Sequence, residues 1–202
     1  MPEAKKEQVL SVRDLDITFK TTAGPVHAIR GVNIDLYKGE TVALVGESGS
    51  GKSVTMKAAM GILAKNATVN SGSIQFSYHH ADGSPETVDL LQKDKKWIRR
   101  HINGKRIAMV FQDPMTGTAA TMQIEENLAL AARRGKRRTL RIGITKAERE
   151  QYRELLKTLD LGLEDRLTAR VGLLSGGQRQ ALTLLMATLV TPKLLLLDEH
   201  TA

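Results

Sequence analysis

The sequence predicts an α/β fold, because short apolar runs typical of buried strands are separated by segments with helical periodicity. The chain has 202 residues, enough for one domain with an inserted lobe. Hydrophobic residues make up 41% and charged residues 26%, as in an ordinary globular protein. There is no cysteine, which excludes disulfides, thiolate metal sites and thiol nucleophiles and fits a reducing compartment.

The first half of the chain is expected to be rich in strands. Partial alternation predicts strands over residues 8–20, 26–37 and 73–78. The apolar run at residues 41–45 predicts a buried parallel strand, and the pattern then turns helical over 52–63. Between residues 79 and 96 the chain is polar and contains an Asp-Gly pair and a proline, so an exposed loop passing into a short helix is expected there.

The second half is expected to be mostly helical. The apolar pattern predicts a strand over residues 106–111 and two amphipathic helices over residues 124–134 and 146–159. A mostly apolar, buried helix is predicted over 178–190, and the leucines of 194–197 predict a central strand covered on both faces. This order indicates an α/β core with a helical lobe.

The charge and the apolar runs limit the possible functions. The formal net charge is +8. Much of the positive charge lies in one run: Arg133, Arg134, Lys136, Arg137, Arg138 and Arg141. This run is either a solvated helix end or a patch for a polyanion or anionic lipid. It contains no aromatic residue, which argues against a nucleic-acid surface.

Neither a secretory signal nor a membrane span is predicted. The first six residues are polar and charged, and no apolar stretch follows them. Pro192 and Lys193 interrupt the longest apolar region, residues 181–197, and leave it too short to cross a bilayer. We therefore expect a cytoplasmic chain that contacts a membrane only through a partner.

Residues 46–53, here called the phosphate loop, match the pattern G-x-x-x-x-G-K-S/T between a predicted strand and a predicted helix. They are Gly46, Glu47, Ser48, Gly49, Ser50, Gly51, Lys52 and Ser53. The glycines let the backbone curl so that its N–H groups point at a phosphate, and the helix predicted over 52–63 adds the partial positive charge of its N-terminus. Lys52 supplies a full charge, and the Ser53 hydroxyl can ligate Mg²⁺. The alternative is a chance glycine-rich turn, which the flanking strand and helix argue against.

Two carboxylates follow the predicted strand at 194–197. Ligands of open α/β sheets bind at the carboxyl ends of strands. Asp198 is therefore predicted to hold Mg²⁺, and Glu199 to polarise the attacking water as a general base. A solvated acidic turn is the alternative, which the upstream phosphate loop disfavours.

A second anion-binding feature lies between these two motifs. The signature segment consists of Leu174, Ser175, Gly176, Gly177 and Gln178. Ser175 can cap a helix that starts near Gln178, and the glycines leave backbone amides open. The sequence LSGGQ, with a phosphate loop before it and an apolar strand ending in Asp-Glu after it, resembles the ABC ATPase family over essentially the whole chain.

The resemblance implies a fold and several residue roles. The fold is a P-loop NTPase core with an N-terminal antiparallel β subdomain and an inserted α-helical subdomain, truncated after the Walker B strand. Residues 1–112 and 179–202 would form the nucleotide-binding core, and 113–178 the helical subdomain. Gln112 would ligate Mg²⁺ and face the membrane partner, Phe19 would stack on adenine, and the signature segment would close over ATP held by a second subunit. The alternatives are a core aromatic for Phe19 and a plain loop residue for Gln112.

The implied function is ATP- and Mg²⁺-dependent energising of a membrane importer for peptides or another small nutrient. The implied partners are a second ATPase subunit, transmembrane permease subunits and a substrate-binding protein, on the cytoplasmic face of the membrane. No nucleic acid is expected. Two other interpretations stay open: an ABC ATPase that acts on nucleic acid or ribosomes, or an inactive nucleotide-binding fragment.

The subfamily signal divides near residue 115. Residues 8–115 resemble ATPases of oligopeptide and dipeptide importers, whereas 117–202 resemble another importer group linked to amino-acid uptake. We therefore expect a chimeric chain. The resemblance also implies a further Ala-Leu-Asp loop and a histidine beyond residue 202, so we expect weak stability and poor ATP hydrolysis from the 202 residues alone.

Overall fold

The computed structural model describes residues 6–113, 115–134, 136 and 143–198. The chain divides into two compact units, which we call the first unit, Met1–Asn103, and the second unit, Gly104–Ala202. Each unit is described by itself below.

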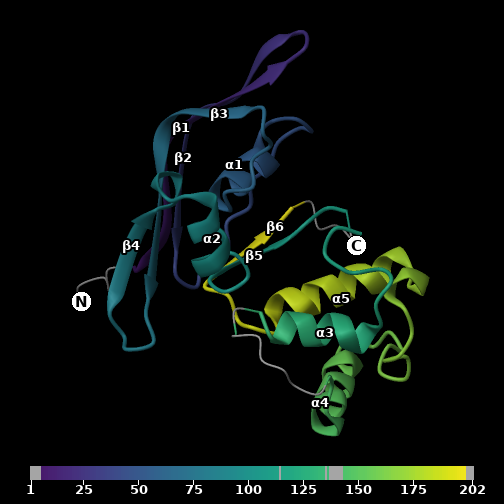
Figure 1. Ribbon diagram of the computed structural model, residues 1–202. Helices are drawn as coiled ribbons and strands as arrows, with labels where there is room; N and C mark the ends of the chain where they lie inside the picture. The colour runs from purple at the N-terminus through teal and green to yellow at the C-terminus, as the bar shows by residue number, and fades with distance from the viewer. Residues whose placement is uncertain (1–5, 114, 135, 137–142, 199–202) are drawn as a thin grey trace. The chain divides into compact units, whose positions relative to one another are not determined.

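The first unit is built on an antiparallel sheet with the strand order β2-β1-β3-β4 (Figure 1). The strands are β1 Gln8–Thr21, β2 Gly24–Tyr37, β3 Ala67–His79 and β4 Pro85–Asp89. The three strands predicted at 8–20, 26–37 and 73–78 are confirmed, and β3 begins six residues earlier than expected. Leu15, Ile17, Ile74 and Phe76 are fully buried and form its apolar face.

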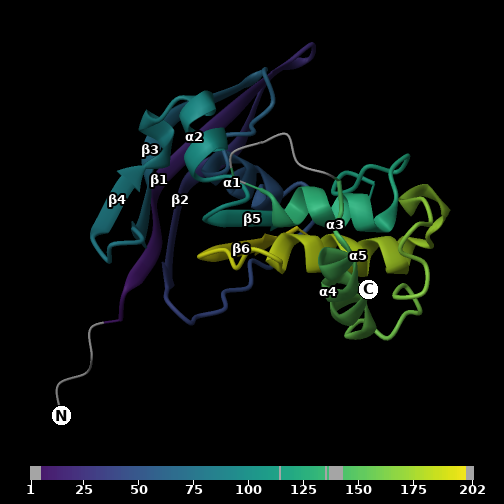
Figure 2. The same cartoon turned by 60° about the horizontal axis from the view of Figure 1, so that its bottom comes forward.

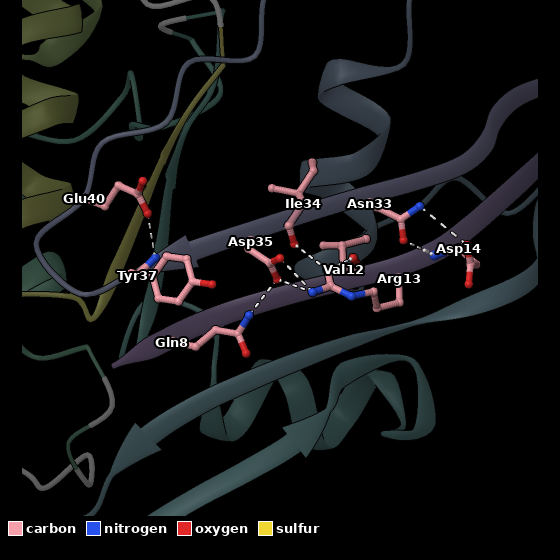
Figure 3. Close-up of polar contacts among 9 residues, drawn as sticks. All are labelled: Gln8, Val12, Arg13, Asp14, Asn33, Ile34, Asp35, Tyr37 and Glu40. Atoms are coloured by element: carbon pink, nitrogen blue, oxygen red, sulfur yellow. Dashed lines mark hydrogen bonds and ion pairs between the residues drawn. The ribbon is translucent and has the colours of Figure 1, made fainter. Parts of the chain in front are cut away.

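Polar contacts between β1 and β2 fix their register (Figure 3). Arg13 donates to both carboxylate oxygens of Asp35 at 2.6 and 2.7 Å, and Gln8 donates to the same carboxylate at 2.6 Å. The register shifts between Val12 and Leu15, where Asp14 has a φ of 45°. The backbone N–H of Asp14 donates to the Asn33 side chain at 3.0 Å, so the bulge is held by a side chain from β2.

The loop expected at 79–96 contains a strand that the sequence did not predict. β4 pairs with β3 from Gln75↔Asp89 to His79↔Pro85 across a turn at Gly83, whose φ is 84°. The proline is tolerated because β4 is an edge strand at which the backbone N–H is not needed. The short helix that was expected to follow is confirmed as α2 Lys95–His101, after the 3₁₀ turn η1 Leu90–Gln92.

The strand predicted at residues 41–45 is wrong. These residues belong to no strand in the described structure and are exposed, with Val45 at 94%. An apolar run becomes a strand only where another strand takes its backbone hydrogen bonds, and apolarity alone does not supply that partner.

The helix predicted over 52–63 is α1 Lys52–Ala59, which ends earlier than expected. Gly61 adopts a φ of 63°, and the N–H of Ile62 donates to the carbonyl of Lys57 at 3.0 Å. This left-handed glycine closes the helix with a Schellman-type end.

The second unit combines a parallel strand pair with helices (Figure 2). β5 Ile107–Val110 and β6 Leu194–Leu197 pair in parallel, from Ile107↔Leu194 to Val110↔Leu197. Ala108 and Val110 pack against Ala187 of α5 Gly176–Thr188. Cover on both faces, as predicted for 194–197, is wrong for Leu197, which is 46% exposed. The predicted central position is also wrong in the described structure, where β6 pairs only with β5.

The helices of the second unit share one apolar core. α3 Ile124–Ala132, α4 Lys146–Lys157 and α5 confirm the three predicted helices, with ends that differ by about two residues. Ile124, Leu128, Leu156 and Leu182 are fully buried in it. α3 and α5 lie side by side (Figures 1 and 2). None of the helices in the described ranges is long and apolar enough to cross a membrane.

Candidate functional site

The phosphate loop curls around the side chain of Lys52. Its ammonium donates to the carbonyl of Gly46 at 2.7 Å, to the carbonyl of Glu47 at 2.9 Å and to the Ser50 hydroxyl at 3.3 Å. A turn inside the loop is closed by the Ser50 N–H, which donates to the Glu47 carbonyl at 3.1 Å. The loop backbone therefore folds back on the Lys52 ammonium, and Lys52 is the first residue of α1.

Glycine is required where the loop enters α1. Gly51 is the N-cap of α1 with a φ of 93°, a conformation that costs an L side chain energy. A Cβ at this position would lie 2.4 Å from Ile29 Cδ1 of β2 and 2.9 Å from the carbonyl oxygen of Ala28. The loop is therefore pressed against the sheet with no room for a side chain.

The chemistry of this loop fits a phosphate group. Lys52 and Ser53 occupy the first turn of α1, where backbone N–H groups have no partner within the helix. The helix start, the ammonium and the hydroxyl all favour an anion at the same end of α1. Phe19 lies on β1 of the same unit, half-buried and paired with Val26 and Ala67, so it is not part of the fully buried core.

In the second unit, Gln112 and Asp198 follow the carboxyl ends of two neighbouring parallel strands. The N–H of Asp198 donates to the carbonyl of Val110 at 3.0 Å, which extends the β5–β6 pairing by one bond. Asp198 is 5% exposed, whereas Gln112 is exposed. The structure thus brings these two predicted residues to one edge, and Glu199 lies outside the described residues.

The signature segment forms the start of α5. Ser175 is the N-cap, and its hydroxyl accepts from the N–H of Gln178 at 3.2 Å. The Gln178 side chain accepts from the N–H of Ser175 at 3.2 Å, which completes a capping box. The predicted capping is confirmed, although the helix begins at Gly176 and not near Gln178. Leu174 is buried at 7%, while Gly176 and Gly177 are exposed and have open space at their α-carbons.

The predicted residues therefore form two sets. Lys52, Ser53 and the rest of the phosphate loop share the first unit with Phe19, and Gln112, Asp198 and the signature segment share the second. The described residues contain no group of three or more His, Cys, Asp or Glu that could hold a metal. Ser53 in the first unit, and Gln112 and Asp198 in the second, each carry an oxygen atom of a kind that Mg²⁺ accepts.

Two buried polar residues near the signature segment were missed from the sequence. Asn127 is 1% exposed on α3, and Arg179 is 5% exposed on α5. An asparagine inside an otherwise apolar helix face was the available signal, because a buried amide requires hydrogen-bond partners.

A glycine-rich loop at a helix start and a glycine-rich helix cap are typical of nucleotide-binding α/β proteins. The ABC transporter family model matches residues 29–202, and the chain belongs to that family of ATPases. The chain is also similar to a dimeric ATP-binding cassette solved in a post-hydrolysis state with ADP and Pi, with a TM-score of 0.73 and 22% identity over 94% of this chain and 73% of that one. This likeness confirms the predicted fold class.

Among curated proteins, the chain is similar to importer ATPases. It is 40% identical to the dipeptide transport ATP-binding protein DppD of Bacillus subtilis, over 96% of this chain and 54% of that protein. It is 33% identical to a tyrosine transport ATP-binding protein of Clostridioides difficile, over 96% of this chain and 70% of that protein. The chain thus spans about half the length of its dipeptide and oligopeptide relatives, at 54% and 51%. Each of these two relatives aligns with 96% of the chain and so covers both segments, and the two-origin interpretation stays a prediction.

Proposed function

We propose that this chain is the ATP- and Mg²⁺-binding part of an ATPase subunit that energises an ABC importer for peptides or another small nutrient, with poor hydrolysis by the 202 residues alone. The observation that carries this proposal is the 40% identity to a dipeptide transport ATP-binding protein over 96% of the chain. The geometry of the phosphate loop supports it, because Lys52 and the start of α1 converge on one anion-binding position.

The proposed roles follow from the chemistry of each side chain. Lys52 and the loop amides bind the β- and γ-phosphates, and Phe19 stacks on adenine. Ser53, Gln112 and Asp198 supply oxygen ligands for Mg²⁺, which neutralises charge on the phosphates when bound. Glu199 polarises the attacking water as a general base. Residues 1–112 and 179–202 form the core of this domain, and 113–178 its helical subdomain.

The proposed partners follow from the signature segment. Gly176 and Gly177 expose backbone amides at the start of α5, which suits the ATP held by a second copy or a paralogue. The pair of ATPase subunits docks on permease subunits at the cytoplasmic face of the membrane, and a substrate-binding protein delivers cargo to those permease subunits.

The test is co-expression of this chain with candidate permease subunits of peptide importers. We expect them to co-purify with the chain and to show ATP turnover that Glu199→Gln removes without removing ATP binding, because only the general base is lost. An assembly whose turnover survives Glu199→Gln, or a chain that never binds the permease, would contradict the proposal.

Nucleic-acid binding is the alternative function, and a separate binding measurement tests it. Salt-sensitive nucleic-acid binding that is lost on neutralising the basic run would favour it. In the described part of that run, Arg133 is engaged with Glu148 at 3.0 Å, and Arg134 donates to the carbonyl of Met186 at 2.9 Å. Both guanidiniums therefore have internal partners, and Arg137, Arg138 and Arg141 lie outside the described residues.

A further inference from the structure

Two segments of the second unit run antiparallel to each other, one leading into α3 and one leading to the signature segment. Residues 117–125 form the first, and residues 167–172 form the second. Backbone N–H groups donate across them at 2.8–3.0 Å, from Ile124 to Ala169, Glu125 to Leu167, Val171 to Met122 and Gly172 to Ala120. The second segment continues directly into Leu174 and Ser175, so its position sets where α5 begins.

Asn127 holds the first of these segments in place from α3. Its Oδ1 accepts from the N–H of Ala119 at 2.8 Å, and its Nδ2 donates to the carbonyls of Ala119 at 3.1 Å and Gln123 at 2.9 Å. The residue is 1% exposed, so water cannot replace these bonds without opening the structure.

Arg179 and a close backbone approach hold the second segment. Arg179 of α5 is 5% exposed, and its guanidinium donates to the carbonyl of Val171 at 3.1 Å. Gly172 lies so near the first segment that a Cβ would be 3.0 Å from the carbonyl oxygen of Ala120. One continuous set of contacts therefore runs from Asn127 through both segments to the first turn of α5.

We propose that Asn127 is a positioning residue for the signature segment. By fixing residues 119–123 it fixes residues 171–172 against them, and with those the N-cap Ser175. Asn127 contacts neither nucleotide nor metal in this scheme and acts only through the backbone of these two segments. Its effect on activity rests on the proposed function, because the signature segment acts on ATP held by another subunit.

Hydrogen exchange tests the positioning without relying on activity. Asn127→Asp removes the three hydrogen bonds that Nδ2 donates to the carbonyls of Ala119, Met122 and Gln123, and places a carboxylate oxygen against those carbonyl oxygens. We expect about ten- to hundredfold faster exchange at the amides of Val171 and Gly172, as the loss of a buried hydrogen bond implies, while the amides of α4 change much less.

Leu128→Ala is the matched control. Leu128 is the next residue of α3 and is fully buried in the apolar core, but it makes no bond to residues 119–123. Its truncation should raise exchange evenly across α3, α4 and α5. If Asn127→Asp gives that same even pattern, or leaves Val171 and Gly172 as protected as before, the positioning role is overturned.

A second variant tests the contact without a buried charge. Gly172→Ala must push back the Ala120 carbonyl by a few tenths of an ångström. We expect it to speed exchange of the Gln178 amide by about threefold or more, since a shifted segment disturbs the cap. Unchanged exchange at Gln178 would contradict the link between residue 172 and the signature segment.

ATP-driven self-association, measured by sedimentation, gives the functional consequence. Asn127→Asp should bind ATP as the wild type does and lose about tenfold or more in association, whereas Leu128→Ala should associate normally once folded. A wild-type chain that does not self-associate with ATP would exclude a second copy as the partner in the proposed function, and the exchange data would still decide the positioning role.

Discussion

Gly51 lies where the phosphate loop packs against β2, and its backbone has a left-handed conformation that only glycine adopts without strain. Gly49 of the same loop also has a positive φ, 83°, but has open space around its α-carbon. An alanine at either position costs about 1–2 kcal/mol for the left-handed conformation. At Gly51 a clash with Ile29 and the Ala28 carbonyl adds to that cost.

We therefore expect Gly51→Ala to lower the free energy of unfolding by clearly more than Gly49→Ala does. Urea denaturation of both variants checks this difference, since the slope should stay the same and only the midpoint should move. Equal midpoints for the two variants would mean that Gly51 is not packed against β2.

The sequence predicted which residues form the phosphate loop but not what Lys52 binds within it. The pattern identifies a cation next to glycines, whereas its bonds to the carbonyls of Gly46 and Glu47 depend on how the loop folds back. Asn127 was missed for the same reason, because its partners are backbone groups that the sequence does not mark.

At the scale of elements, α4 and α5 begin with the same kind of capping box. Ser175 and Gln178 form one, and Thr145 and Glu148 form the other. Ser175→Ala and Thr145→Ala should each cost about 0.5–2 kcal/mol of stability, as the loss of an N-cap does. Only Ser175→Ala should also weaken ATP-driven self-association, measured by sedimentation. Equal association of the two variants would indicate that the signature segment caps α5 and does not contact ATP of another subunit.

The cap of α4 also makes a pH prediction. The N–H of Thr145, followed by Arg133, holds the pKa of Glu148 at about 2, below its ordinary 4.5. A carboxyl with a depressed pKa stabilises the fold above pH 4.5, and this stabilisation is lost as the pH falls toward about 2. Glu148→Gln should flatten the pH dependence of unfolding in that window, and an unchanged dependence would contradict this assignment.

Helices whose own sequence carries a periodic pattern or a capping residue were predictable. Strands that depend only on pairing with another strand were not. The helical pattern predicted α4 within about two residues, and Ser175 as a predicted cap marked the start of α5. β4 has a polar sequence and is a strand only because β3 pairs with it. Residues 41–45 show the reverse, since they are apolar but have no strand beside them in the described structure.

At the scale of the whole chain, the comparisons establish the family and leave the two-origin interpretation as a prediction. The DppD and tyrosine-transport relatives both align with 96% of the chain. If two origins are present, residues 8–115 aligned alone should favour the dipeptide and oligopeptide group, and 117–202 aligned alone should favour the other. One group matching both segments better would remove the interpretation.

The central claim is that the phosphate loop binds the phosphates of ATP. The most direct measurement is a calorimetric titration of the chain with ATP and Mg²⁺, comparing Lys52→Ala with Lys57→Ala, which removes a lysine from the last turn of the same helix. We expect the wild type and Lys57→Ala to bind alike and Lys52→Ala to bind about ten- to hundredfold more weakly, as the loss of a charge-assisted hydrogen bond implies. Equal binding by all three proteins, or no binding by the wild type, would contradict the claim.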